Sequence, residues 1–223
     1  MWSPMGDGRA RSVGRRSGPY RGKRLVDLAV LAIVALPALA IGSVCGLAIR
    51  LTSRGPVFFR QQRVGMDGRP FTIWKFRTMI DGPDNPVIPL DSHITRTGRW
   101  LRRTSLDELP QLLNVAAGEM SIVGPRPTLA YQVERYDDRQ RRRLSVRPGI
   151  TGLAQIHGRN AIDWASRIDH DLDYIERQSA WLDLRILTAT LGAVTRGSGV
   201  EGHSIDDPMS APPVHPSGAP RDG

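Results

Sequence analysis

The stretch LVDLAVLAIVALPALAIGSVCGLAI, residues 25–49, decides the architecture of this chain. Its only charged residue is Asp27, close to the start, and the run is long enough to cross a bilayer as a helix. It is too long for the apolar part of a signal peptide, and no small-residue cleavage site is evident at its end. The sequence therefore predicts a membrane-inserted helix over residues 23–50.

The surroundings of this run favour a helix that enters the bilayer and returns. Pro37 stands in the middle, where it removes a backbone hydrogen bond and breaks the helix. Positive charge normally collects on one side of a spanning segment, but here both flanks are basic. We expect a re-entrant helix, with a Pro-containing spanning helix as the alternative. Asp27 would lie near the interface and pair with Arg24 or another flanking cation. The basic residues are Arg9, Arg11, Arg15, Arg16, Arg21, Lys23 and Arg24 before the run, and Arg50, Arg54, Arg60 and Arg63 after it.

The composition indicates an anionic partner and a reducing compartment. The 223 residues include 31 Lys and Arg against 22 Asp and Glu, a formal charge of +9. Nucleic acid, an acidic membrane surface and a phosphorylated small substrate all fit that charge. The single cysteine, Cys45, excludes an internal disulfide and a thiolate metal cluster. Because it lies in the apolar run, we expect an inert buried thiol.

The remaining chain is predicted to be a mainly helical α+β domain over residues 51–196, between a disordered basic segment, 1–22, and a disordered tail, 197–223. Asp67-Gly68 predicts a hairpin of strands 57–62 and 71–76. The link 81–95 is expected to be a loop. Helices are expected over 107–116, 128–145, 161–176 and 180–194. The apolar stripe of the last helix is most often core, with a place on the membrane surface as the alternative; it comprises Trp181, Leu184, Leu187, Leu191 and Val194.

An acidic pair, Asp107 and Glu108, stands in TSLDELPQLLN, residues 104–114. Ser105 followed by Glu108 is the pattern of a capping box, so a structural helix cap is the favoured interpretation of these residues alone. Neighbouring residues on a helix diverge by about a hundred degrees, so the two carboxylates cannot do identical work. A carboxylate near arginines can attack phosphorus or hold a divalent cation such as Mg²⁺.

Three further stretches carry cations on stiff or glycine-rich backbone. Each one alone is typical of a strand end or a tight turn, but together they supply the rigid guanidinium groups and exposed amides that grip a diphosphate. They are KFRTM with Lys75 and Arg77, VGPRP with Pro125 and Arg126, and VRPGITGLAQIHGRN with Arg147 and Arg159.

The sequence lacks the motifs of several other kinds of functional site. The histidines show no H-x-x-x-H zinc spacing, and there is neither a G-x-S-x-G elbow nor a Walker P-loop. The basic run Arg141 to Arg143 has no stacking aromatics between its members, so nucleic acid is not an expected partner.

The motifs KRLVDL, PVFFRQQRVG, FTIWKFRTM, TSLDELPQLLNVAAGEMSIVGPRP and VRPGITGLAQIHGRNAIDW occur in this order. Together they resemble the bacterial sugar transferases, the monotopic polyprenol-phosphate phosphoglycosyl transferases, over about residues 23–200. The chain looks like the minimal catalytic form. One departure is Leu36, which stands where the family often has Ser before the Pro; Ser43 is too far along to replace it.

The resemblance implies transfer of a sugar-1-phosphate from a UDP-sugar to polyprenol (undecaprenyl) phosphate, giving a polyprenyl-diphospho-sugar and UMP, at the first membrane step of polysaccharide or glycoconjugate synthesis. It places the enzyme monotopically on the cytoplasmic face of the bacterial inner membrane. Asp107 would form a covalent phosphosugar intermediate, and Glu108 would support Mg²⁺ or the second transfer. Arg102 would bind phosphate and Arg126 the donor. A non-catalytic, membrane-anchored basic scaffold and a nucleic-acid-binding protein are the alternatives.

Overall fold

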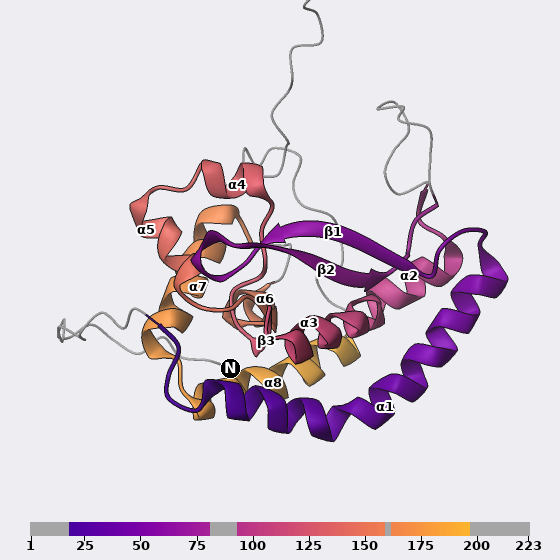
Figure 1. Ribbon diagram of the computed structural model, residues 1–223, viewed down its shortest axis with the longest axis horizontal. Helices are drawn as coiled ribbons and strands as arrows, with labels where there is room; N and C mark the ends of the chain where they lie inside the picture. The colour runs from indigo at the N-terminus through magenta and orange to yellow at the C-terminus, as the bar shows by residue number, and fades with distance from the viewer. Residues whose placement is uncertain (1–17, 81–92, 159–161, 197–223) are drawn as a thin grey trace, which may run out of the picture.

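The computed structural model describes residues 18–80, 93–158 and 162–196 (Figure 1). The segments predicted to be disordered, 1–17 and 197–223, lie outside the described residues, as does most of the expected loop, 81–92. Residues 18–22, expected within the disordered N-terminal segment, are described: the Tyr20 hydroxyl donates to Asp183 at 2.8 Å.

The apolar run forms one helix, α1 (Lys23–Thr52), which is long and apolar enough to cross a membrane by length and composition. The predicted break at Pro37 is replaced by a continuous helix that changes direction along its length (Figure 1). A proline removes one hydrogen bond, and a bend can accommodate that loss without ending the helix. As expected, Ser43 does not replace the missing serine, because its hydroxyl donates to the Leu39 carbonyl at 2.9 Å.

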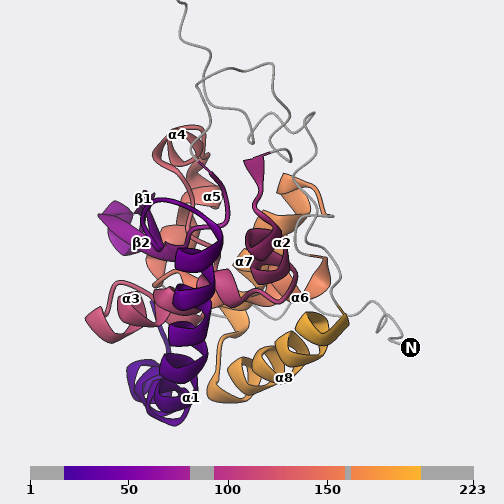
Figure 2. The ribbon, with the colours of Figure 1, turned by 90° about the vertical axis from the view of Figure 1, so that its right-hand side faces the viewer.

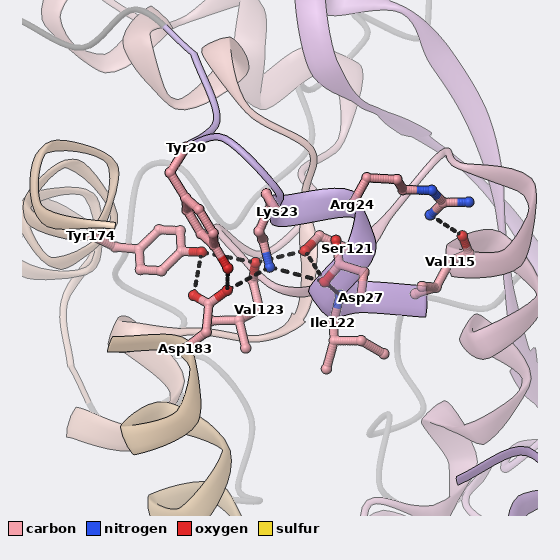
Figure 3. A network of polar contacts seen from close by, with 10 residues as sticks. All are labelled: Tyr20, Lys23, Arg24, Asp27, Val115, Ser121, Ile122, Val123, Tyr174 and Asp183. Atoms are coloured by element: carbon pink, nitrogen blue, oxygen red, sulfur yellow. Dashed lines mark hydrogen bonds and ion pairs between the residues drawn. The ribbon is translucent and has the colours of Figure 1, made fainter. Parts of the chain in front are cut away.

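The start of α1 is fixed by a buried polar network (Figure 3). Lys23 lies between two carboxylates, 2.9 Å from Asp27 and 2.8 Å from Asp183. Asp27 also accepts from the Ser121 hydroxyl and the Ile122 amide, and Asp183 accepts from Tyr174. Asp27 therefore pairs with Lys23, whereas Arg24 donates to the Val115 and Ala116 carbonyls.

The end of α1 returns to the same domain. Cys45 and Ile49 are buried with Phe76 and Leu101, which confirms the expected buried thiol. Between the two anchored ends the apolar side chains are uncovered: Ile33 is 77% exposed, Leu36 79% and Leu39 70%. The long helix thus holds the domain at both ends and presents bare apolar surface in between.

The predicted hairpin is confirmed. Strands β1 (Phe58–Val64) and β2 (Pro70–Phe76) pair antiparallel from Phe58↔Phe76 to Val64↔Pro70. The turn η1 (Met66–Gly68) places both Asp67 (φ 57°) and Gly68 (φ 75°) in the left-handed region, which the Asp-Gly pair tolerates.

A second, parallel sheet was not predicted. It pairs β3 (Ser121–Val123) with β4 (Gly149–Thr151), each too short for a periodic signal. The backbones come so close that a Cβ on Gly149 would lie 2.1 Å from the Gly124 nitrogen, so glycine is required there. The Gly124 amide donates to Thr151 and the Gly149 amide to Pro125, which fixes the chain that follows β3.

The helices differ in detail from the expected ones. The helix expected over 107–116 begins as 3₁₀ structure, η3 (Leu106–Gln111), which contains Pro110, before α3 (Leu112–Ala117). The helix expected over 128–145 is divided into α4 (Ala130–Glu134), α5 (Asp138–Arg141) and η4 (Arg142–Ser145), because Asp137 starts a new helix by capping Gln140. The others are α2 (Arg96–Arg103), α6 (Leu153–His157), α7 (Trp164–Arg177) and α8 (Ala180–Arg196).

The expected core position of the α8 stripe is confirmed for Leu187, which packs against the core, and is wrong for three other members. Trp181, Leu184 and Leu191 are exposed, while Asp183 and Ile186 face the domain, the former because it joins the buried Lys23 network. In Figures 1 and 2, α1 and α8 lie along the same side of the molecule, the lower side in these views, with the hairpin toward the other. Both helices that carry uncovered apolar residues therefore lie on one side of the molecule.

Candidate active site

The acidic pair lies on η3, and the capping box predicted for it does not form. Ser105 adopts a left-handed conformation (φ 56°) and its side chain caps nothing; only its carbonyl accepts, from the Glu108 amide. Without that cap, the Glu108 side chain turns away from the helix start. Neither carboxylate therefore takes part in the helix cap that the sequence pattern favours.

Glu108 is held by two cations from other parts of the chain. Its Oε1 accepts from Lys75 Nζ at 2.8 Å and from Arg126 Nη2 at 2.6 Å, and Oε2 accepts from Arg126 Nη1 at 3.4 Å. Burial by itself would raise the pKa of Glu108, but Arg126 and Lys75 outweigh it and hold that pKa well below its usual range. Glu108 is thus a fixed anion at any physiological pH.

Asp107 is buried beside Glu108 and its two cations, but its own carboxylate is not held by them. Its carboxylate accepts no hydrogen bond and makes no ion pair with any residue among those that the structure describes. Burial, reinforced by the negative charge of Glu108, raises the pKa of Asp107 to about 6, against the opposing effect of Lys75, Arg126 and Arg102. The adjacent carboxylates therefore differ sharply: Glu108 is paired, whereas Asp107 is desolvated and has no partner among the described residues. An open carboxylate of raised basicity is suited to nucleophilic attack.

The framework that positions Arg126 is itself buried. The Arg143 guanidinium donates to the Arg126 carbonyl at 3.3 Å and to the Tyr136 hydroxyl, and it forms a buried ion pair with Asp171. The flanking Pro125 is buried, and its carbonyl accepts a hydrogen bond from the Gly149 amide. The backbone that carries Arg126 is therefore held on both sides. This rigidity is what the two prolines around Arg126 predict.

The structure brings some of the predicted binding residues together and separates others. Arg102 acts on Asp107 through its charge, and its Nη2 lies 3.7 Å from the Met79 sulfur. Arg77 instead bonds the hydroxyl and carbonyl of Ser53 at the end of α1. Arg147 donates to the Gly118 carbonyl at 2.7 Å. Arg159 lies outside the described residues.

Arg63 is a cation near the site that the sequence analysis counted only as flanking charge. It donates to the Pro127 carbonyl at 3.3 Å, next to Arg126. Burial, together with the neighbouring Arg126, lowers the pKa of Arg63 to about 10. The alternation of the hairpin could have placed it, because every second residue of a strand shares one face.

The donor set suits a magnesium ion only in part. Within the described ranges, no group of three or more His, Cys, Asp or Glu gathers to hold a metal. Glu108 already accepts hydrogen bonds from Lys75 and Arg126, whereas no described residue donates to the Asp107 carboxylate. Mg²⁺ commonly uses one or two protein carboxylates, with substrate phosphates and water completing its shell. The residues therefore fit a Mg²⁺ ion that takes one ligand from the protein and others from a bound diphosphate.

A profile of bacterial sugar transferases matches residues 19–197, which include both ends of α1, the acidic pair and Arg126. The chain belongs to the bacterial sugar transferase family. The family resemblance, and with it the prediction of an enzyme, is thereby confirmed.

Members of this family with similar sequences differ in length. "Uncharacterized sugar transferase EpsL" of Bacillus subtilis (strain 168) is 46% identical over 182 residues, 80% of this chain and 90% of that protein. "Exopolysaccharide production protein ExoY" of Sinorhizobium fredii is 39% identical over 218 residues, 87% of this chain and 93% of that protein. The "UDP-glucose:undecaprenyl-phosphate glucose-1-phosphate transferase" of Klebsiella pneumoniae is 45% identical over 181 residues, 76% of this chain but 39% of that longer protein.

Proposed function

We propose that this sugar transferase moves a sugar-1-phosphate from a UDP-sugar to a polyprenol phosphate by way of a covalent intermediate on Asp107. The single observation that carries the proposal is the contrast within the acidic pair. Glu108 is held between Lys75 and Arg126. Asp107 is buried, accepts no hydrogen bond from a described residue and lies within the field of three cations. The names of two relatives supply the substrate class, and UDP-glucose is the first donor to test.

The first half-reaction begins with the open carboxylate. An Asp107 oxygen attacks the phosphorus that carries the sugar, and the bond from that phosphorus to the bridging oxygen breaks. UMP leaves with the bond electrons, and an aspartyl phosphosugar remains. Arg126 and Lys75, already fixed by Glu108, stabilise the charge that gathers on the phosphoryl oxygens.

The second half-reaction restores the enzyme. A phosphate oxygen of the polyprenol phosphate attacks the phosphorus of the aspartyl phosphosugar, and the bond to the Asp107 oxygen breaks. The carboxylate regains its electrons, and the polyprenyl-diphospho-sugar departs. A bound Mg²⁺, held by Asp107 and phosphate oxygens, would act as a Lewis acid toward the phosphoryl group. Two sequential displacements let a water-soluble donor and a lipid acceptor use one site in turn.

Re-entrant insertion of α1 is part of the same proposal. Asp27 near its start and Ile49 near its end are both buried against one domain, and Ile33, Leu36 and Leu39 between them are uncovered. A spanning helix would place its ends on opposite sides of the bilayer, which one rigid domain cannot contact at once. A helix that dips into one leaflet satisfies both anchors, and the basic flanks indicate the cytoplasmic face.

The exposed stripe of α8 fits a position on the membrane surface. Trp181, Leu184 and Leu191 are exposed, and α8, which carries them, lies on the same side of the molecule as α1 (Figure 2). Tryptophan and leucine on one face of a helix are typical of interfacial segments. With both helices in one leaflet, the acidic pair stays close to the headgroups, where the acceptor presents its phosphate.

The test is UMP release by detergent-solubilised protein with Mg²⁺, undecaprenyl phosphate and a panel of UDP-sugars, including UDP-glucose. Release with a single sugar, lost in Asp107→Asn and on addition of EDTA, is the expected result. Asp67→Asn is the matched control, because Asp67 is exposed in the hairpin turn and asparagine tolerates its left-handed conformation. No UMP with any donor, from folded protein, would overturn the proposal and favour a scaffold.

A further inference from the structure

Arg63 is a largely buried cation that forms no ion pair with a carboxylate in the part of the chain that the structure describes. No described Asp or Glu lies within ion-pair distance of it; its two hydrogen bonds go to neutral acceptors, the Pro127 carbonyl and, at 2.7 Å, Gln61 Oε1. Its Nε is buried without a hydrogen-bond partner. Taking an arginine out of water without a counter-ion costs free energy, so such an arrangement is typical of a site that awaits an anion.

The hairpin directs Arg63 toward the active site. Arg63, Gln61 and Phe59 alternate along β1 and therefore share a face, and Phe59 pairs with Lys75 of β2. Arg63 and Lys75 thus belong to the same face of the hairpin. Between them lies Arg126, which contacts Glu108 directly and sits next in the chain to Pro127, the acceptor of Arg63. Lys75, Arg126 and Arg63 form a row of cations.

The charges of the site leave room for a diphosphate. Four cations, Lys75, Arg102, Arg126 and Arg63, face two carboxylates, Asp107 and Glu108. Two positive charges are therefore in excess, and a nucleotide sugar carries roughly two negative charges, one for each phosphoryl group.

The position of Arg63 in the row indicates which phosphate it meets. Lys75, Arg126 and Arg102 act on Asp107, the attacking group. Arg63 bonds the Pro127 carbonyl and pairs with Phe71, four positions along β2 from Lys75, which places it at the far end of the row. The phosphorus under attack must lie next to Asp107. We propose that Arg63 binds the other phosphate of the donor, the one that departs with the nucleoside. This role rests on the proposed function and adds a residue to it.

In chemical terms, Arg63 neutralises the charge that the leaving phosphate gains when its bond to the sugar-bearing phosphorus breaks. The effect belongs to the first half-reaction and to its reversal, in which UMP attacks the aspartyl phosphosugar. The second half-reaction involves a different phosphate, that of the polyprenol, after UMP has left. Arg63 is therefore expected to matter in one half of the cycle and not in the other.

The experiment measures the two halves separately in Arg63→Gln, Arg63→Lys and Arg60→Gln. Exchange of labelled UMP into UDP-glucose, or into whichever donor releases UMP in the panel, reports the first half without acceptor. Chase of the labelled protein intermediate with undecaprenyl phosphate reports the second. Arg60 is the matched control, because it lies three residues earlier on the opposite face of β1, exposed and over the Trp74 ring.

The expected result for Arg63→Gln is an increase of about 10- to 100-fold in the UMP and donor concentrations needed for half-maximal exchange, the loss typical of one charged hydrogen bond. The chase should stay within about twofold of wild type, Arg60→Gln should match wild type, and Arg63→Lys should fall between, because it keeps the charge and loses the forked geometry. Melting temperatures of all variants serve as the folding check, and Arg63→Lys carries the test if Arg63→Gln does not fold.

Two results would overturn this role. Wild-type exchange in both Arg63 variants would show that the residue does not meet the donor, and equal losses in exchange and chase would indicate a structural role. A wild-type enzyme that exchanges no UMP with any donor would instead overturn the proposed function, and the role of Arg63 would fall with it.

Discussion

Asp107 is the residue on which the chemistry depends, and its environment predicts a pH profile. Burial and the charge of Glu108 raise its pKa to about 6. Attack requires the ionised carboxylate, so the rate of UMP release in a single turnover should fall below about pH 6, by roughly tenfold for each further pH unit. Stopped-flow or quenched-flow measurement between pH 5 and 8.5 would check this. A rate that is flat down to pH 5 would exclude Asp107 as the titrating nucleophile.

The same burial predicts that Asp107→Asn stabilises the protein while abolishing turnover. A carboxyl whose pKa is raised from 3.8 to about 6 costs stability above pH 6, where it is charged; each pKa unit corresponds to about 1.4 kcal/mol. We expect Asp107→Asn to raise the free energy of unfolding by about 1–3 kcal/mol at pH 8 without Mg²⁺.

The advantage of Asp107→Asn should shrink as the pH falls from about 6 to 4. In that window the wild-type native state binds a proton that the unfolded state does not yet bind, so the wild type gains stability. Denaturation in detergent at pH 8 and pH 5 measures the difference. A variant less stable than wild type at pH 8 would mean that the carboxylate makes favourable contacts in the protein.

At the scale of elements, the buried polar network at the start of α1 anchors this helix to the domain (Figure 3). Lys23→Met would leave Asp27 and Asp183 facing each other without a cation, and removal of one partner from a buried ion pair typically costs about 3–5 kcal/mol. We expect a large loss of stability, measured by denaturation. Arg21→Met, at an exposed position two residues earlier, should change stability little, and equal effects of the two changes would contradict the anchoring role.

Sequence patterns predicted the elements that depend on local signals. The apolar run predicted where α1 lies, and Asp67-Gly68 predicted the hairpin, because each signal lies within the element that it specifies. The parallel pair β3–β4 could not be found, since it joins three-residue segments more than twenty positions apart. The capping box at Ser105 failed because tertiary cations, Lys75 and Arg126, attract Glu108 more strongly than a local amide does.

The same distinction holds for the site. Asp107, Glu108 and Arg126 were recognised from their motifs, and the structure places them together. Arg77 carries a positive charge in the same motif as Lys75 but bonds Ser53 at the end of α1. Sequence alone reveals which side chains could bind phosphate, but packing decides which cations lie beside the acidic pair, as Lys75 and Arg126 do, and which bond elsewhere, as Arg77 does.

At the scale of the whole molecule, the anchoring of both ends of α1 predicts a one-sided topology. In a Cys45→Ala background, Arg21→Cys before α1 and Arg50→Cys near its end introduce thiols at exposed positions. Both should react with a membrane-impermeant maleimide in inverted vesicles and be protected in intact spheroplasts. Opposite accessibility of the two positions would establish a spanning helix and contradict re-entrant insertion.

The central claim is that an open carboxylate on a membrane-bound domain carries the sugar phosphate between two substrates. Mass spectrometry of protein incubated with Mg²⁺ and the active UDP-sugar, without acceptor, tests it most directly. We predict a gain of one sugar phosphate on the peptide that contains Asp107, removed by undecaprenyl phosphate and absent in Asp107→Asn. UMP release that requires the acceptor, with the protein unmodified throughout, would show direct transfer and contradict the account.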